Sequence, residues 1–416
     1  MAPTPPVRDA LPNNVVDLLR AGMRIFVSGS VNEPVALLEQ LRAGPLPDGI
    51  EFVQFPIGGM NTTDFTALSE TARLTTVFMT PDLRNADPQR LSFLPMQMRQ
   101  FFDYVSQGID LALIQVGRDR AGNLRAGPNV DFLDALLDSD AMIAAQLNET
   151  VVAPPGARLI APDRLACLAS AARPLPELTA ASIDTVAAQI GAQVAQLIQD
   201  GDCLQTGIGA IPAAILSALG TKNDLGWHGG LIDDGVLDLI SAGNVNGARK
   251  SIDSGLHITG MALCSAAYHE RLSSLPSVVF RGANYTHDVS VIRQLRQFVS
   301  VNSAVQVDLS GQVNAEVVGG RQISGTGGSV DFMRAAKLSA GGRSIVALNA
   351  TARGGRVSRI VPQVEHVTAL RTDIDIVVTE FGAASLRDLP LAARGEALQA
   401  IAAPQFREEL MARTAE

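Results

Sequence analysis

The fold of this chain is decided by two stretches, Gly22-Met-Arg-Ile-Phe-Val-Ser-Gly29 and Gly201-Asp-Cys-Leu-Gln-Thr-Gly207. Each has a short apolar centre of strand type and ends on a glycine. Each then leads through a proline, Pro34 or Pro212, into an apolar run, residues 35–41 or 213–219. Proline is tolerated near the first turn of a helix, where its missing N–H costs nothing. The pattern therefore predicts a strand, a turn and a helix, once in each half of the chain.

A second pair of segments repeats in the same order. Residues 110–116 run into Asp119-Arg-Ala-Gly122-Asn-Leu124, and residues 298–307 run into Asp308-Leu-Ser-Gly311-Gln-Val313. Both follow a strand pattern with the spacing Asp-x-x-Gly-x-(Leu/Val), in which Asp can cap a turn and Gly can take a positive φ. Two repeats in one order indicate that the chain is a duplication of one α/β plan.

The other strand patterns extend this plan to an architecture. Further strands are predicted at residues 50–55, 141–147, 344–348 and 374–379, and an amphipathic helix at 182–199. Strands that alternate with helices favour mostly parallel sheets covered on both faces. A linker with two prolines, residues 171–181, separates the halves. We predict an α/β protein of two tandem open α/β/α domains, residues 1–180 and 181–416, with the active-site cleft between them.

Composition narrows the class of protein. The 416 residues are 47% hydrophobic and 18% charged, enough apolar material for two folded domains. A formal charge of -9 argues against a nucleic-acid partner or an anionic membrane surface. The Pro-rich start is not a signal peptide, and no apolar run approaches the ~20 residues that span a bilayer. We expect a soluble, cytoplasmic protein.

The spacing of the cysteines and histidines indicates whether the chain could form disulfides or bind a metal ion. The three cysteines lie far apart without a CxxC pair, which is typical of buried thiols in a reducing compartment. The five histidines form no HxH or HExxH pattern. We expect no metal site.

Three glycine-containing loops could bind a ligand. In Gln205-Thr-Gly-Ile-Gly-Ala-Ile-Pro212 the glycines expose backbone N–H groups at a helix start, which suits an anion or oxyanion, although a plain tight turn would look the same. Gly325-Thr-Gly-Gly328 could approach a ligand closely or simply join a strand to a helix. Arg353-Gly-Gly-Arg356, with Arg359 beyond it, suits phosphate groups, because guanidinium groups hold phosphates bidentately; a solvated loop is the alternative.

The sequence around these loops resembles that of the acetyl-CoA hydrolase/transferase family, which includes acetate and 4-hydroxybutyrate CoA-transferases. The similarity is strong from about residue 185 to 410, and the string Gly319-Gly-Arg-Gln-Ile-Ser-Gly-Thr-Gly-Gly-Ser-Val-Asp-Phe332 is nearly the family's own. The resemblance implies a CoA-transferase-like fold and coenzyme A as the ligand. It places the oxyanion loop at Gly207, Ile208 and Gly209. It implies CoA contacts at Gln205, Gly325, Gly327, Gly328, Arg353, Gly354, Gly355 and Arg356.

The chain departs from this family at its catalytic position. The family reads Gly-(Ile/Val)-His-(Ser/Thr)-Glu-Met, and its Glu is the covalent nucleophile. This chain reads Gly226-Trp-His-Gly-Gly-Leu231, so Gly230 replaces the Glu. Without a nucleophile the two-step transfer through a glutamyl-CoA is blocked. The two glycines are also expected to leave a void for water or a bulkier acyl group.

Three functions remain open on these residues. Water could be activated, with His228 as general base or as a structural residue of the loop, to hydrolyse an acyl-CoA or cleave a β-ketoacyl-CoA C–C bond. Alternatively, a displaced carboxylate could transfer CoA to a small carboxylate; Asp233 is the freest, and Asp234, Glu149 and Glu316 are further candidates. Finally, the chain could bind CoA without catalysis. We favour hydrolysis, with an acyl-CoA as partner, and expect a homo-oligomer.

Overall fold

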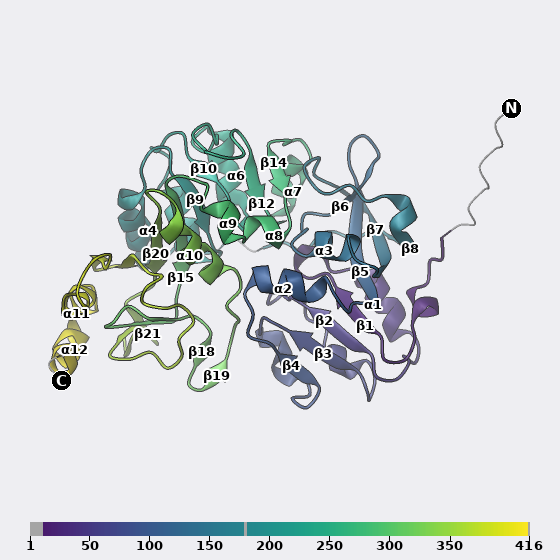
Figure 1. Cartoon of the computed structure of the whole chain (residues 1–416), viewed down its shortest axis with the longest axis horizontal. Coiled ribbons are helices and arrows are strands. Elements are labelled where there is room, and N and C mark those ends of the chain that lie inside the picture. Colours follow the sequence, from purple (N-terminus) through teal and green to yellow (C-terminus); the bar gives the residue numbers. More distant parts are fainter. Residues whose placement is uncertain (1–10, 179–180, 415–416) are drawn as a thin grey trace.

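Two mostly parallel sheets, one from each half of the chain, organise the computed structural model, which describes residues 11–178 and 181–414 (Figure 1). The first contains β1 (Arg24–Val27), β2 (Glu51–Gln54), β3 (Arg73–Thr76), β4 (Leu91–Phe93), β5 (Leu111–Arg118), β6 (Leu124–Ala126), β7 (Met142–Val152) and β8 (Leu165–Ala171). Its order is β4-β3-β2-β1-β5-β7-β8, all parallel, and β6 pairs antiparallel with β5.

The second sheet repeats this plan with six strands. They are β9 (Cys203–Thr206), β10 (Gly226–Trp227), β15 (Phe298–Ser303), β20 (Arg343–Ala347), β24 (Ile376–Thr379) and β25 (Gly382–Ser385). The order is β10-β9-β15-β20-β24-β25, and β25 is the antiparallel edge. The predicted α/β class with mostly parallel sheets is confirmed.

Helices connect these strands. The helices are α1 (Val35–Arg42), α2 (Met98–Val105), α3 (Leu133–Leu137), α4 (Thr185–Leu197), α5 (Ala210–Ser217), α6 (Asp234–Ser241), α7 (Ala266–Leu272), α8 (Ala283–Thr286), α9 (Val289–Ile292), α10 (Ser329–Leu338), α11 (Leu391–Ala400) and α12 (Arg407–Thr414). Short 3₁₀ turns lie at η1 (Val15–Leu18), η2 (Ser30–Asn32), η3 (Phe65–Ala67), η4 (Pro81–Asn85), η5 (Pro162–Arg164) and η6 (Pro404–Phe406).

Small two- and three-stranded pieces flank the second sheet. They are β11 (Leu231–Ile232) with β13 (Met261–Ala262), β12 (His257–Thr259) with β14 (Val278–Phe280), β16 (Gln306–Asp308) with β17 (Val313–Asn314) and β23 (Ile360–Val361), β18 (Val317–Val318) with β19 (Arg321–Gln322), and β21 (Thr351–Ala352) with β22 (Val357–Ser358).

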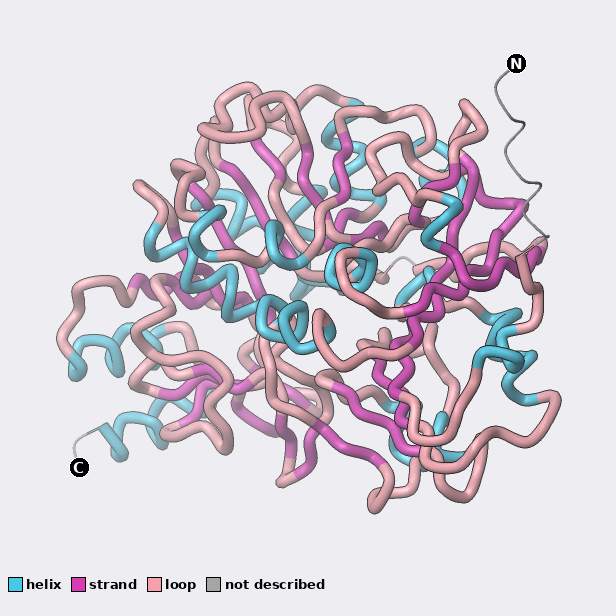
Figure 2. Tube along the Cα trace, turned by 45° about the vertical axis from the view of Figure 1, so that its right-hand side comes forward, coloured by secondary structure: helices cyan, strands magenta, loops and turns pink. Residues whose placement is uncertain are grey.

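Alternating side chains place helices on both faces of each sheet (Figure 2). In β20, Ile345 and Ala347 belong to the cluster that includes residues of α4 and α5, whereas Val346 lies between them in sequence and belongs to the cluster with residues of α10. In β1, Ile25 packs in the cluster of α1, and Phe26 in that of α2. Successive strand residues point to opposite faces, so strands buried on both faces need a nearly continuous apolar sequence.

The predicted repeated turn is present in both halves. Asp119 Oδ1 accepts hydrogen bonds from the N–H groups of Ala121 and Asn123, both at 2.9 Å, and Gly122 has φ +84°. In the second half Asp308 Oδ1 accepts from the equivalent two N–H groups, both at 3.0 Å, and Gly311 has φ +93°. The same local chemistry therefore builds the same turn twice.

The two halves share one hydrophobic cluster. Phe26 and Phe101 from the first half pack in the same cluster as Trp227 and Val299 from the second. The predicted domain boundary, near residue 180, lies at residues 179–180, which are outside the described residues. Trp227 is fully buried, and its Nε1–H donates to the Leu231 carbonyl at 3.3 Å, so it is a core residue.

Candidate active site

A cavity of about 340 Å³ lies where the carboxyl ends of the two sheets meet. The first half contributes Phe55, Ile57, Phe78 and Met98, which follow β2 and β3 or begin α2. The second half contributes the loop after β9, the end of β15 and the glycine-rich loop before α10. Ligands of open α/β sheets bind beyond the carboxyl ends of strands. The cleft between the two halves is thus where the sequence predicted it.

Seven of the residues predicted for the site line this cavity. They are Gln205, Gly207, Ile208, Gly230, Gly325, Gly327 and Gly328. Gly209 is just outside the lining, at the N-cap of α5 with φ +112°, so α5 begins three residues earlier than predicted. The side-chain amide of Gln205 accepts a hydrogen bond from Asn302 Nδ2 at 3.2 Å, which fixes it at the cavity wall.

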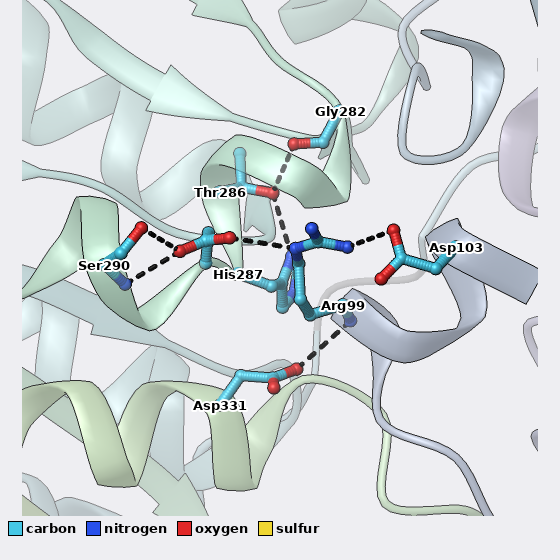
Figure 3. A network of polar contacts seen from close by, with 8 residues as sticks. Arg99, Asp103, Gly282, Thr286, His287, Ser290 and Asp331 are labelled. Atoms are coloured by element: carbon cyan, nitrogen blue, oxygen red, sulfur yellow. Dashed lines mark hydrogen bonds and ion pairs between the residues drawn. The ribbon is translucent and has the colours of Figure 1, made fainter. Parts of the chain in front are cut away.

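The glycine-rich loop needs glycine because it touches the first half directly. A Cβ at Gly325 would lie 2.1 Å from the carbonyl oxygen of Val77. Two residues on, the Gly327 carbonyl accepts a hydrogen bond from the Met98 N–H at 3.2 Å. Arg99 Nε also bonds Asp288 Oδ2 across the same boundary at 2.9 Å (Figure 3). The loop, the cavity and the contact between the halves are therefore one structural unit.

The space beside Gly230 is filled by a side chain that the sequence did not single out. A Cβ at Gly230 would lie 2.8 Å from Nε2 and 2.9 Å from Cε1 of His287. A Cβ at Gly328 would lie 2.2 Å from the same Nε2. The prediction of a void at Gly230 is therefore wrong, because an imidazole sits between the two glycines and lines the cavity.

Hydrogen bonds hold this imidazole in one orientation. His287 is the C-cap residue of the short helix α8, and its Nδ1 lies 2.8 Å from the hydroxyl of Thr286. That hydroxyl also donates to the Gly282 carbonyl at 3.2 Å, as Figure 3 shows. The His287 ring centroid is 4.6 Å from that of Phe332. Burial lowers the pKa of His287 to about 3, so the ring is neutral near pH 7.

His228 is close in sequence to Gly230 but does not line the cavity. The ring is fully buried, and Nε2 lies 3.2 Å from the Thr286 carbonyl, the last of α8. Since a carbonyl can only accept, Nε2 carries the proton. Burial lowers the pKa of His228 to about 3. This position favours the structural alternative for His228 over the role of a base that meets water.

The four carboxylates that the sequence offered as possible nucleophiles lie away from the cavity, and three of them cap or bind other groups. Asp233 caps α6 by accepting from the Val236 N–H at 3.1 Å, and burial raises its pKa to about 6. Asp234 accepts from the Ser265 N–H at 3.1 Å. Glu316 is buried and accepts from Gln322 Nε2 at 3.2 Å, whereas Glu149 is exposed. These four carboxylates are not part of the cavity lining.

The arginine loop lies outside the main cavity. Arg353, Gly354, Gly355 and Arg356 form the turn between β21 and β22, with both arginines exposed. Arg353 borders a separate cavity of about 300 Å³ that is also lined by Arg359. The two cavities adjoin the same segment, since Ala315 lines the first and Val317 the second. A ligand that occupied both cavities would have to be an extended molecule.

Sequence reasoning missed His287, Asn302 and the residues from the first half. The strand predicted at 50–55 could have placed Phe55 at a carboxyl end, but no motif surrounds His287. Among residues 11–178 and 181–414 no group of three or more His, Cys, Asp or Glu side chains is placed to hold a metal ion. The same described residues include no helix long and apolar enough to cross a membrane.

Comparison with known proteins identifies the family and the fold. Residues 265–414 match the family model of the acetyl-CoA hydrolase/transferase C-terminal domain. The chain is 35% identical to a 4-hydroxybutyrate coenzyme A transferase of Clostridium kluyveri over 93% of this chain and 92% of that protein. The crystal structure of RipA from Yersinia pestis superposes with a TM-score of 0.91 at 29% identity, over 98% of this chain and 96% of that one.

A 4-hydroxybutyrate CoA-transferase from Porphyromonas gingivalis superposes with a TM-score of 0.80 at 30% identity, over 96% of this chain and 95% of that one. Similarity therefore extends over both halves and is not limited to the C-terminal segment. The chain belongs to the acetyl-CoA hydrolase/transferase family, a family of enzymes that act on CoA thioesters.

Proposed function

We propose that this protein hydrolyses an acyl-CoA by direct attack of an activated water on the thioester. One observation carries the proposal. At Gly230, where the resembled family has its nucleophilic Glu, the backbone has no side chain and the adjacent space is filled by His287. A carboxylate cannot reach the thioester from this point, so a glutamyl-CoA intermediate is not available, whereas a water molecule needs no covalent partner.

The rest of the cavity supports binding and polarisation of a thioester. Gly207 and Ile208 lie at the start of α5, where backbone N–H groups can stabilise the negative charge that develops on the carbonyl oxygen. Gly325, Gly327 and Gly328 would contact CoA along the cavity wall. Arg353, which lines the adjoining cavity, and the exposed Arg356 of the same turn would meet its phosphates. Coenzyme A enters this scheme as part of the substrate.

Transfer of CoA by a displaced carboxylate is the second candidate, because the relatives named above are CoA-transferases. It would require Asp233 to leave the N-cap of α6, or another carboxylate to enter the cavity. Cleavage of a β-ketoacyl-CoA C–C bond is a variant of the first candidate and also needs an activated water. In the third alternative, a CoA-binding protein without catalysis, the glycine and arginine loops would still bind CoA, but no thioester would be turned over.

The test is an assay of the purified chain with a panel of acyl-CoAs, in the presence and absence of acetate. Hydrolysis predicts release of free CoA without acetate and one ¹⁸O atom in the product acid when the water is labelled. Transfer predicts that CoA release or exchange depends on the acceptor. It also predicts a hydroxylamine- or borohydride-trapped mass shift on the peptide that contains Asp233. Tight CoA binding without turnover of any thioester would support the non-catalytic alternative. Light scattering would test the expected homo-oligomer.

A further inference from the structure

We infer that His287 is the general base that activates water in this cavity, and that it has taken over the position of the missing carboxylate. The inference rests on the proposed hydrolytic function and names the residue that performs it. Its grounds are the place of the imidazole, the protonation of its two nitrogens and the rigidity of its surroundings.

The first ground is position. Nε2 of His287 lies 2.8 Å from where a Cβ at Gly230 would stand and 2.2 Å from where one at Gly328 would stand. The imidazole therefore occupies the space that a side chain at Gly230 would enter. The residue lines the same cavity as Gly207 and Ile208, the loop that would hold the thioester oxygen. A base and an oxyanion site in one cavity are the two parts that nucleophile-free thioester hydrolysis requires.

The second ground is the tautomer. The Thr286 hydroxyl has a single hydrogen, and its hydrogen bond to the Gly282 carbonyl at 3.2 Å uses that hydrogen. In that arrangement the hydroxyl accepts from His287 at 2.8 Å, and the imidazole proton lies on Nδ1. Nε2 keeps its lone pair and has no hydrogen-bond partner among the described residues. An unprotonated ring nitrogen on a residue that lines the cavity is what a general base needs.

The third ground is rigidity. Phe332 packs against the imidazole with the two ring planes tilted by 45°, and the backbones of Gly230 and Gly328 lie close to Nε2. His228 Nε2–H donates a hydrogen bond to the Thr286 carbonyl at 3.2 Å. This bond anchors the end of α8, one residue before His287. His228 is therefore a positioning residue in this scheme. Catalytic groups held by packing and by a second layer of hydrogen bonds keep their geometry without reorganisation.

The reaction balances without an external cofactor. Nε2 takes a proton from water as the water oxygen bonds to the thioester carbon, and the carbonyl electron pair moves onto the oxygen. The C–S bond then breaks as the carbonyl re-forms, and the imidazolium returns its proton to the CoA sulfur. The products are the carboxylic acid and free CoA, and the imidazole is neutral again. The oxyanion that forms in the cavity raises the proton affinity of the buried imidazole while it holds the proton.

Three variants test the inference: His287→Asn, His287→Ala and, as a control, the half-exposed His366→Asn. Asn can still donate to Thr286 but has no base at the Nε2 position. We expect kcat for acyl-CoA hydrolysis to fall about 10²–10⁴-fold in both His287 variants, with little change in CoA affinity. Imidazole in the buffer should restore part of the rate in His287→Ala, where space has opened. His366→Asn should keep the wild-type rate.

Several outcomes would overturn the assignment. A kcat within twofold of wild type in His287→Ala would do so, as would a loss that imidazole cannot restore and that comes with weaker CoA binding. A trapped acyl group on the peptide containing His287 would make it a nucleophile and not a base. The proposed function fails separately, if the wild-type protein hydrolyses no acyl-CoA at all. Thermal unfolding of each variant shows whether the fold is retained.

Discussion

Adding one methyl group at Gly230 should test the contact on which the site depends. Gly230→Ala places a Cβ 2.8 Å from Nε2 of His287, and ordinary contact begins at 3.4 Å, so the imidazole must retreat by about 0.6 Å. It has little room, because the Gly328 backbone is also close to Nε2, where a Cβ would stand only 2.2 Å away, and Phe332 packs against the ring. Overpacking of this kind costs about 1–3 kcal/mol of unfolding free energy.

The neighbouring Gly229 is a matched control. A Cβ there would lie no closer than 3.4 Å to another atom, and neither glycine has a positive φ. Both substitutions gain the same ~0.4–1 kcal/mol from a stiffer unfolded chain, so that contribution cancels in the comparison. We therefore expect Gly230→Ala to be less stable than Gly229→Ala by about 1–3 kcal/mol in urea unfolding at pH 7.

A double variant identifies the neighbour responsible. In Gly230→Ala/His287→Ala the imidazole is gone, so the penalty at Gly230 should vanish and the coupling energy should equal it. Equal unfolding midpoints for the two single glycine variants would refute the close contact. A penalty that persists without the imidazole would show that something other than His287 resists the methyl group.

Three further predictions follow from the site. Gly230→Glu alone should not create a CoA-transferase, because the imidazole blocks the side chain; Gly230→Glu/His287→Ala should gain acetate-dependent CoA transfer, and activity in the single variant would contradict the steric reading. Arg353→Ala and Arg356→Ala should each weaken CoA binding, more at low than at high salt, whereas unchanged affinity would make the loop a solvated surface. Because burial holds the pKa of His287 near 3 against ~6.5 in the unfolded chain, the unfolded state binds the extra proton below pH ~6.5 and stability falls on acidification. His287→Asn should reduce that slope by about 1.4 kcal/mol per pH unit between pH 6 and 4, measured by urea unfolding; an unchanged slope would show that the ring is not buried and neutral.

Local patterns in the sequence were enough to predict the fold. The strand expected at 50–55 is β2, and those expected at 344–348 and 374–379 are β20 and β24, each within two residues at either end. Helix boundaries were less well predicted. The helix expected at 182–199 is Thr185–Leu197, because the Asp184 side chain caps it by accepting from Ala187 N–H at 2.8 Å.

The glycine-rich part of the site was also predictable, because close backbone approach leaves a mark in the sequence. Gly325 must be glycine against the Val77 carbonyl, and Gly209 needs its positive φ to start α5. The wall from the first half was not predictable in this way. Phe78 and Met98 are ordinary apolar residues whose place at the cavity depends on how the halves pack.

By itself the sequence determined the two α/β halves, their repeated turns and the family, and it places a glycine at position 230. These properties depend on neighbours along the chain, through alternating apolar residues, turn chemistry and short motifs. Only the tertiary structure decided which side chain lies beside Gly230. Gly230 and His287 are far apart in sequence, and the imidazole reaches the cavity because α8 ends there, held by His228 and Thr286. Contacts between distant segments follow from the packing of whole elements, which local sequence does not encode.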